Sequence, residues 1–212
     1  MNIWAIVPSK PLKRSKSRLS SVLTSQQREN LSREMLSHTL VTLSKAQGIA
    51  GTLLVSRDTA ALSMARRMGV QTLTESGSPE LNASLERATR FVATWKASGV
   101  LIVASDIPLL RPDDVEEMLA LTNKHPVVVV APDRRGTGTN AMLVRPPGLF
   151  PYRFGENSFA RHCSEGESAG ARVYIYQSPT VGLDVDIPAD LDLYRELLAE
   201  NSTNESIWHA SM

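Results

Sequence analysis

The sequence predicts an α/β protein: a single domain with a mostly parallel mixed sheet and helices on both faces of that sheet. Strand-like and helix-like patterns alternate along almost the whole chain, which is typical of domains built from β-α-β units. Unbroken apolar runs at 100–104 and 127–130 indicate strands covered by helices on both sides, and we expect them at the centre of the sheet. The chain has 212 residues, enough for one domain of this kind.

The first half of the chain shows its elements clearly. Residues 2–7 form an apolar strand pattern. Thr24, followed three positions later by Gln27, has the spacing of a capping box and predicts a helix that continues to about Ala46. The elements expected after it are a strand at 52–55, a helix at 58–68 and a strand at 69–73.

Two amphipathic helices flank the apolar run at 100–104. In the first, apolar residues recur at intervals of four and three, which places them on one face that should pack on the sheet. These residues are Leu81, Leu85, Ala88, Val92 and Trp95. The second helix should begin at Pro112, because proline favours the first helical position and two aspartates follow it in the first turn.

The second half of the chain has weaker patterns. The expected elements are strands at 140–144, 171–176 and 181–185, a loop at 146–154 and a short helix at 158–164. Pro188 should open a final helix that ends near Ala199. The segment 201–212 is polar and is expected to fray, so we assign 1–200 to the domain and 201–212 to a polar tail.

Composition and charge narrow the classes of function. The formal net charge is +1, which argues against a general nucleic-acid or membrane-binding surface. Cys163 is the single cysteine, so an internal disulfide is excluded. We expect Cys163 to serve as a small, partly buried packing residue. No cysteine and histidine spacing resembles a zinc site. The chain lacks a long apolar run and a signal-peptide pattern, so we expect a soluble, cytoplasmic protein.

The stretch 10–18 is the most strongly basic part of the chain. Its cations are Lys10, Lys13, Arg14, Lys16 and Arg18, and it directly follows the first strand. Ligands of open α/β sheets bind at the carboxyl ends of the strands, so this loop is placed to hold a polyphosphate. A Walker A sequence and a G-x-G-x-x-G motif are absent, which leaves the phosphates to side-chain cations. The alternative is a solvated basic loop.

Acidic residues follow two predicted strands. Asp106 comes directly after the apolar run at 100–104, and Asp184 and Asp186 precede Pro188. If a strand continues through 184–186, its period of two places both aspartates on one face. One carboxylate from each segment would suffice for Mg²⁺, which usually binds one or two carboxylates together with substrate phosphates. The alternative is that these aspartates cap helices or turns.

Two further segments have the composition of anion-binding loops. Residues 133–140 combine two arginines with Gly136, Gly138 and hydroxyl side chains, which suits binding of phosphate or carboxylate through backbone N–H groups. An ordinary hairpin connection explains the same residues. Residues 154–158 could form an oxyanion pocket at the start of a helix, with an N-cap serine at Ser158 as the alternative.

These segments, in this order, resemble the phospholactate guanylyltransferases, a family that makes a precursor of the deazaflavin coenzyme F420. The resemblance extends from about Ile3 to Leu197. It is carried by V-P-x-K-P-L-x-x-x-K-S-R-L at 7–19, D-I-P-L at 106–109, A-P-D-R-R-G-T-G-T-N at 131–140, R-F-G with S-F-A-R-H at 153–162, and L-D-V-D with P-x-D-L at 183–191. It implies a fold of the nucleotide-diphospho-sugar transferase type, related to the Rossmann fold.

The resemblance also implies a reaction. GMP would pass from GTP to the phosphate of a small phosphorylated acid, with release of pyrophosphate. A phosphomonoester is already a dianion near neutral pH, so it needs no general base to attack. Lys10, Lys16 and Arg18 would stabilise the leaving pyrophosphate, and Asp106 with Asp184 or Asp186 would bind Mg²⁺.

Substrate contacts carry over from the family as well. Asn140, Gly155 and Ser158 match positions that meet the phosphorylated acid, although some relatives have threonine where this chain has Asn140. Phospholactate, phosphoenolpyruvate and 3-phosphoglycerate are used within the family, and all three stay open. Guanine would be bound within 75–82: a carboxylate at Glu75 suits guanine N1–H and N2–H, and Asn82 ends E-L-N where relatives often have G-L-N. For Glu75 the alternative is a solvated charge at a strand end.

Two other classes of function stay open on the sequence alone. A glycosyltransferase of related fold would use Asp184 and Asp186 as its metal-binding pair, although the basic loop favours a nucleoside triphosphate over a sugar nucleotide. A nucleotide-binding sensor without chemistry would bind GTP and not turn it over. The expected partners are GTP and the phosphorylated acid, with neither nucleic acid nor a membrane, and a homodimer is possible.

Overall fold

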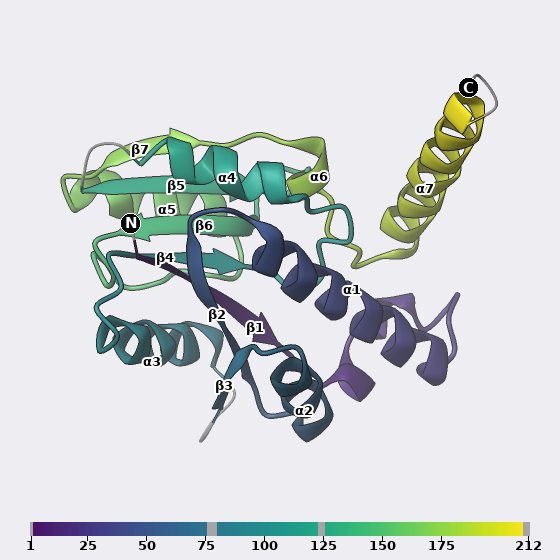
Figure 1. The fold of residues 1–212 in the computed structure, drawn as a ribbon, viewed down its shortest axis with the longest axis horizontal. Coiled ribbons are helices and arrows are strands. Elements are labelled where there is room, and N and C mark those ends of the chain that lie inside the picture. The colour runs from purple at the N-terminus through teal and green to yellow at the C-terminus, as the bar shows by residue number, and fades with distance from the viewer. Residues whose placement is uncertain (1, 76–79, 123–125, 210–212) are drawn as a thin grey trace.

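The fold is built on one sheet of seven strands in the order β3-β2-β1-β4-β6-β5-β7 (Figure 1). The computed structural model describes residues 2–75, 80–122 and 126–209, with side chains described through Ala199. The strands are β1 Ile3–Ser9, β2 Ile49–Ser56, β3 Gln71–Thr74, β4 Gly99–Val103, β5 Val127–Pro132, β6 Thr139–Arg145 and β7 Arg172–Ile175. Only β6 runs antiparallel to its neighbours, β4 and β5, which confirms a mostly parallel mixed sheet.

Helices cover both faces of this sheet, as predicted. The helices are α1 Ser25–Lys45, α2 Thr59–Arg67, α3 Leu81–Ala93, α4 Pro112–Ala120, α5 Ser158–Ser168, α6 Pro179–Gly182 and α7 Pro188–His209, with short 3-10 turns η1 Leu12–Arg14 and η2 Ser17–Leu19. One apolar cluster joins α1, α2 and α4 to one face, and a second joins α3 and the start of α5 to the other. Burial of these two clusters supplies the main driving force for folding.

Several predicted elements are confirmed in detail. Thr24 and Gln27 form a complete capping box at the start of α1. In α3, Leu85, Ala88 and Val92 are buried as the spacing predicts, whereas Leu81 at the first position is 41% exposed. Helix α4 begins at Pro112 with two aspartates in its first turn.

Three expectations about the second half are wrong. The run at 127–130 is not central, because the antiparallel β6 inserts between it and β4 and β7 lies outside it. Residues 181–185 do not form a strand: Pro179 occupies the first turn of α6, and Ser178 caps that helix. Helix α7 continues past Ala199 to His209, since no proline or glycine in 200–209 ends it.

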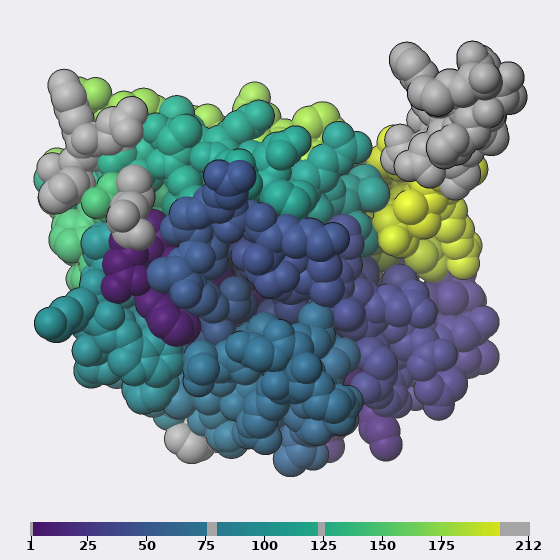
Figure 2. Space-filling view, viewed as in Figure 1, coloured from purple at the N-terminus to yellow at the C-terminus, as the bar shows by residue number. Residues whose placement is uncertain are grey.

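A third, smaller apolar cluster joins the two ends of the chain. Leu19 of η2, Met35 of α1, Val185 and Leu191 of α7 are buried together. In Figure 2 the start of α7, in yellow, lies beside the lighter purple surface of the stretch that leads from the basic loop into α1. This packing fixes the basic loop next to the segment that carries Asp184 and Asp186. Among the helices that the structure describes, none is long and apolar enough to cross a membrane.

Candidate active site

The site forms where β1, β4 and β6 meet at one edge of the sheet. Parallel strands β1 and β4 both end there, and the antiparallel β6 begins there, with Ala141 opposite Val103. The backbone N–H of Ala104 donates to the carbonyl of Asn140 at 2.9 Å. The basic loop, Asp106 and Asn140 are therefore brought to a common edge, which is the usual ligand-binding edge of an open α/β sheet.

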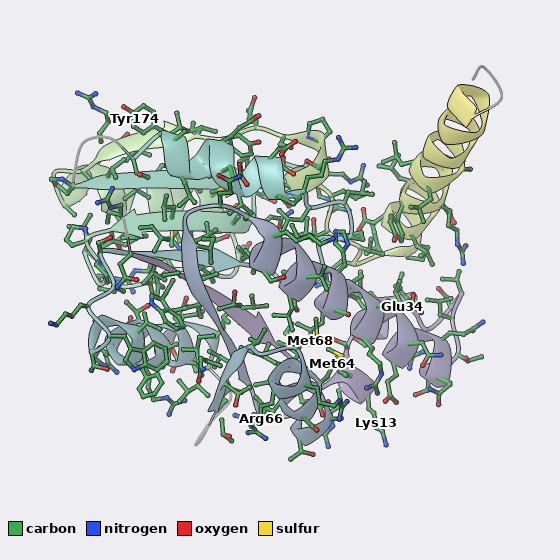
Figure 3. The ribbon with its side chains drawn as sticks, viewed as in Figure 1. Lys13, Glu34, Met64, Arg66, Met68 and Tyr174 are labelled. Carbon is green, nitrogen blue, oxygen red and sulfur yellow. The ribbon has the colours of Figure 1, made fainter. Side chains whose placement is uncertain are left out.

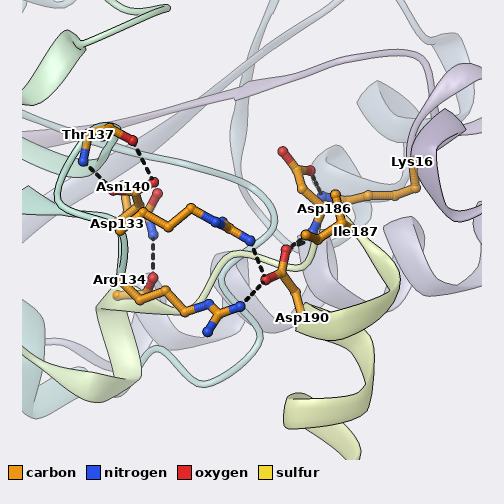
Figure 4. Close-up of polar contacts among 10 residues, drawn as sticks. Lys16, Asp133, Arg134, Thr137, Asn140, Asp186, Ile187 and Asp190 are labelled. Carbon is orange, nitrogen blue, oxygen red and sulfur yellow. Dashed lines mark hydrogen bonds and ion pairs between the residues drawn. The ribbon is translucent and has the colours of Figure 1, made fainter.

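Lys16 links the basic loop to both acidic segments. Its Nζ lies 2.6 Å from Oδ2 of Asp106 and 2.8 Å from Oδ1 of Asp186 (Figure 4 shows Lys16 and Asp186). The Lys16 side chain is 4% exposed, and its backbone is left-handed with φ 57°. Residues separated by as many as 170 positions in the chain thus meet at one point.

The charges of this cluster stabilise one another. Burial alone would lower the pKa of Lys16, but the carboxylates of Asp106 and Asp186 outweigh it and raise that pKa, so the ammonium stays charged. Burial opposes ionisation of Asp186 too, yet Lys16, Arg18 and Lys10 lower the pKa of Asp186. The three predicted phosphate-binding cations therefore act on one carboxylate.

Lys10 and Arg18 are exposed, unlike Lys16. Both are near enough to Asp186 to affect its ionisation, which leaves their side chains accessible to a ligand at the site. Lys13 belongs to the same loop but lies at the outer surface of the molecule (Figure 3). The basic loop therefore divides into cations at the carboxylates and cations turned to solvent.

Asp184 is the third carboxylate of the cluster. Burial, Asp106 and Asp186 together raise the pKa of Asp184 to about 6. Its Oδ1 is buried and has no hydrogen-bond partner, which is costly for a polar atom. Asp184 therefore adds a third carboxylate beside the two that pair with Lys16, and carboxylate oxygens are the ligands that Mg²⁺ prefers. Within the described residues, no group of three or more histidine, cysteine, aspartate or glutamate side chains is placed to hold a metal ion, so one or two carboxylates would have to suffice.

Backbone N–H groups of the loop 133–138 are engaged inside the protein. The carboxylate of Asp133 accepts the backbone N–H groups of Thr137 and Gly138 at 2.8 and 2.9 Å. Arg134 and Arg135 both donate to Oδ1 of Asp190, at 2.7 and 2.6 Å (Figure 4). An aspartate within the loop thus uses two of the donors that an anion would need, which favours the alternative of an ordinary hairpin connection.

Asp190 organises this part of the site, and the sequence patterns gave it no role. It is fully buried, and its Oδ2 accepts the backbone N–H groups of Asp186 and Ile187 at 3.1 and 3.0 Å. Burial opposes its charge, but Arg134 and these N–H groups lower the pKa of Asp190. An aspartate two residues after a helix-opening proline is typical of a first-turn capping residue, and that signal could have found it.

Two of the predicted acceptor residues are buried beside this edge. The amide nitrogen of Asn140 donates to the carbonyls of Val181 and Gly182, at 2.9 and 3.1 Å, so Asn140 also holds α6 in place. Ser158, the first residue of α5, is 2% exposed. The start of α5 is tied to the same edge by a 3.1 Å bond from the N–H of Phe159 to the carbonyl of Thr137.

Gly155, the third predicted acceptor residue, has a backbone φ of +123°, a conformation that favours glycine. A Cβ at this position would have nothing within 4 Å, so the backbone of Gly155 borders open space. The N–H of Ser158 donates to its carbonyl at 3.2 Å. The glycine thus shapes the turn that leads into α5.

The predicted guanine-binding residues are held by other parts of the protein. Glu75 accepts from Nε of Arg57 at 2.8 Å and from Oγ of Ser84 at 2.6 Å. Burial opposes ionisation, but these two bonds lower the pKa of Glu75, so its carboxylate is charged. Within the predicted stretch 75–82, residues 76–79 lie outside the described residues.

Asn82 contacts the acceptor side of the site instead of an open surface. Its amide exchanges two hydrogen bonds with the backbone of Phe154, at 3.1 and 2.8 Å. Because Phe154 precedes Gly155, this pair ties the start of α3 to the acceptor loop. The structure gives Asn82 this linking role, and a contact with guanine stays a prediction.

Comparison with known proteins decides the family. The family model described as "Guanylyl transferase CofC like" matches residues 3–206. This chain belongs to that family. Phosphoenolpyruvate guanylyltransferase of Rubrobacter xylanophilus is 39% identical over 191 residues, covering 90% of this chain and 92% of the relative. 2-Phospho-L-lactate guanylyltransferase of Methanothermobacter thermautotrophicus is 35% identical, covering 90% and 83%.

Solved structures confirm the predicted fold type of this guanylyltransferase. A protein of Desulfovibrio desulfuricans G20 described as a nucleotide-diphospho-sugar transferase matches with a TM-score of 0.73 and 17% identity, over 91% of this chain and 85% of that one. A nucleotidyl transferase from Methanothermobacter matches with a TM-score of 0.66 and 15% identity, over 94% and 98%. The family membership favours guanylyl transfer over the glycosyltransferase and sensor alternatives.

Proposed function

We propose that this guanylyltransferase moves GMP from GTP onto the phosphate of a small phosphorylated carboxylic acid and releases pyrophosphate. Phosphoenolpyruvate is the acceptor we favour, because relatives named for it include a 39% identical chain, with 2-phospho-L-lactate and 3-phosphoglycerate as the alternatives. The observation that carries the proposal is the meeting of Lys16 with Asp106 and Asp186 at the strand edge, beside Asn140. Cations and carboxylates in one place are what transfer between phosphates requires.

The acceptor needs positioning more than activation. Its phosphate is a dianion near neutral pH and can attack the α-phosphorus of GTP directly. We assign Asn140, Gly155 and Ser158 to hold the acid, since they border the edge where the carboxylates lie. Accurate placement of two bound reactants removes much of the entropic barrier to their reaction.

We propose Mg²⁺ as the metal of this site, bound by Asp106 together with Asp184 or Asp186. The buried, unpartnered Oδ1 of Asp184 and the surplus of carboxylates fit a hard divalent cation. When bound, the metal would offset the negative charge of the triphosphate. Lys16 keeps two of these carboxylates neutralised in the structure, so a metal there competes with its ammonium.

Lys10, Lys16 and Arg18 are our proposed contacts for the leaving pyrophosphate. Their positive charges surround Asp186 and lie at the end of β1, where the triphosphate would enter. Fixed cations stabilise charge that develops on a leaving group without reorganising at the moment of reaction. This role is one that the outward-facing Lys13 does not share.

We propose that Glu75 recognises the guanine base, with Asn82 as a second contact for the nucleotide. Arg57 and Ser84 hold the Glu75 carboxylate charged and in one orientation. A fixed carboxylate is suited to accept from the N1–H and N2–H donors of guanine, and adenine lacks both donors in that arrangement.

We further propose a role in deazaflavin coenzyme F420 biosynthesis and, because GTP is a cytoplasmic metabolite, a cytoplasmic location.

A coupled assay of pyrophosphate release tests this function. Purified protein with GTP and Mg²⁺ should release pyrophosphate when phosphoenolpyruvate, 2-phospho-L-lactate or 3-phosphoglycerate is added, and ATP should replace GTP poorly. Asp106→Asn should reduce the rate at least a hundredfold, whereas Asp113→Asn, an exposed aspartate in α4, serves as a matched control. Absence of pyrophosphate release with all three acids would refute the proposal.

A further inference from the structure

His162 is a fully buried histidine of α5 that the proposed reaction does not use. Both of its ring nitrogens are engaged. Nδ1 lies 3.0 Å from Oγ1 of Thr139, and Nε2 lies 3.1 Å from the backbone nitrogen of Arg153. The ring also packs edge-on against Phe154, with ring centroids 4.6 Å apart.

These contacts define which nitrogen carries the proton. The partner of Nε2 is a backbone N–H, which can only donate, so Nε2 must accept and must be unprotonated. In a neutral imidazole the proton then resides on Nδ1, which donates to the hydroxyl oxygen of Thr139. Burial of the ring lowers the pKa of His162 to about 4, in spite of the charge of Glu165. The ring is therefore neutral at physiological pH, as this hydrogen-bond pattern requires.

Each contact of His162 lies next to a proposed acceptor residue. Thr139 precedes Asn140 on β6, and Arg153 lies two residues before Gly155. His162 itself follows Ser158 by four positions, so both residues are on the same face of α5. The imidazole thus joins the strand, the loop and the helix that present the acceptor-binding groups.

We propose that His162 is a positioning residue for the acceptor pocket, which holds Asn140, Gly155 and Ser158 in register through Thr139 and Arg153. This inference rests on the proposed function, since it takes those three residues as the acceptor contacts. The loop at Gly155 depends on contacts with the rest of the protein to fix it, because glycine permits many backbone conformations. Its backbone is tied to the protein by His162 at Arg153 and by Asn82 at Phe154.

Kinetics of two His162 variants test the role. His162→Leu removes both hydrogen bonds, whereas His162→Gln keeps an acceptor for the N–H of Arg153. We expect KM for phosphoenolpyruvate to rise at least tenfold in His162→Leu and less in His162→Gln, with KM for GTP within twofold of wild type. Supporting groups behind a binding residue have effects of this size in metal sites.

Glu165→Gln is the matched control for these variants. Glu165 lies on the same helix and pairs with the Arg153 side chain at 2.9 Å, but that pair is exposed and leaves the Arg153 N–H bond intact. Its KM for phosphoenolpyruvate should stay near wild type. An unchanged KM in His162→Leu, or equal rises in KM for both substrates, would overturn the positioning role.

A spectroscopic measurement tests the inference without turnover. In ¹⁵N NMR of the labelled wild-type protein at neutral pH, the buried imidazole should show a protonated Nδ1 and an unprotonated Nε2. A proton on Nε2, or a charged ring, would overturn the proposed contacts. If the wild type releases no pyrophosphate with any acid, the proposed function fails, while this tautomer measurement still decides the geometry of His162.

Discussion

The buried imidazole of His162 should make the stability of the protein depend on pH. In the unfolded chain its pKa is the ordinary 6.5, and in the folded protein its pKa is about 4. Between these values the unfolded chain binds more protons than the folded one. The free energy of unfolding therefore falls as the pH drops from about 6.5 towards 4, and this contribution is fully retained above that range.

The size of the effect follows from the two pKa values. A difference of one pKa unit corresponds to about 1.4 kcal/mol, so the full loss is about 3 kcal/mol below pH 4. Between pH 7 and pH 5, His162 alone should remove about 2 kcal/mol of stability. Such a loss is a large fraction of the net stability of an ordinary domain.

Urea unfolding of the wild type and of His162→Gln isolates the contribution of His162 to the pH dependence of stability. Carboxylates whose pKa values are lowered, such as Asp190 and Glu75, lose stability at lower pH in both proteins. Asp184, whose pKa is raised to about 6, acts with the opposite sign in both. The difference between the two proteins should therefore shrink by about 2 kcal/mol from pH 7 to pH 5. Parallel pH curves would refute the burial of a neutral imidazole.

Other contacts predict further outcomes. Lys16→Ala should slow pyrophosphate release from GTP at least tenfold while Lys13→Ala leaves it nearly unchanged, and equal rates in the two variants would remove Lys16 from the reaction. Asp190→Asn should lower the free energy of unfolding, measured in urea, by about 2 kcal/mol. The reason is that the buried carboxylate accepts from two arginines and two backbone N–H groups, and an amide accepts more weakly. An unchanged urea midpoint would contradict this. Glu75→Gln should raise KM for GTP about tenfold. An unaltered preference for GTP over ATP in this variant would exclude Glu75 as the residue that recognises guanine.

The sequence was most informative where a local pattern decides the structure. The capping box at Thr24 and the apolar stripe of α3 depend on residues three or four positions apart, and both predictions are confirmed. That Lys16 and Asp106 lie at one edge was also predictable, because both follow parallel strands of the sheet, whereas Asp186 follows α6 and not a strand. The strand expected at 181–185 failed since Pro179 and Ser178 start a helix just before it.

Side-chain pairing between distant segments could not be predicted. Nothing in the sequence near Arg134 indicates that its partner is Asp190, because that contact depends on how β5 and α7 are placed in three dimensions. The same holds for His162, whose two partners come from β6 and from the loop before Gly155. The same difficulty arises within one loop, where the N–H groups of Thr137 and Gly138 donate to the Asp133 carboxylate. The glycines and threonines of this loop are equally typical of an anion-binding site, so the sequence did not reveal these bonds.

The central claim is that the carboxylates at the strand edge carry GMP transfer, and Asp184 tests it most directly. The measurement is the rate of pyrophosphate release from GTP and phosphoenolpyruvate with Mg²⁺, for the wild type, Asp184→Asn and Asp192→Asn. Asp192 is an α7 aspartate whose side chain is 65% exposed. We expect Asp192→Asn to match the wild type and Asp184→Asn to lose at least a hundredfold. A rate for Asp184→Asn within a few-fold of the wild type would contradict the claim.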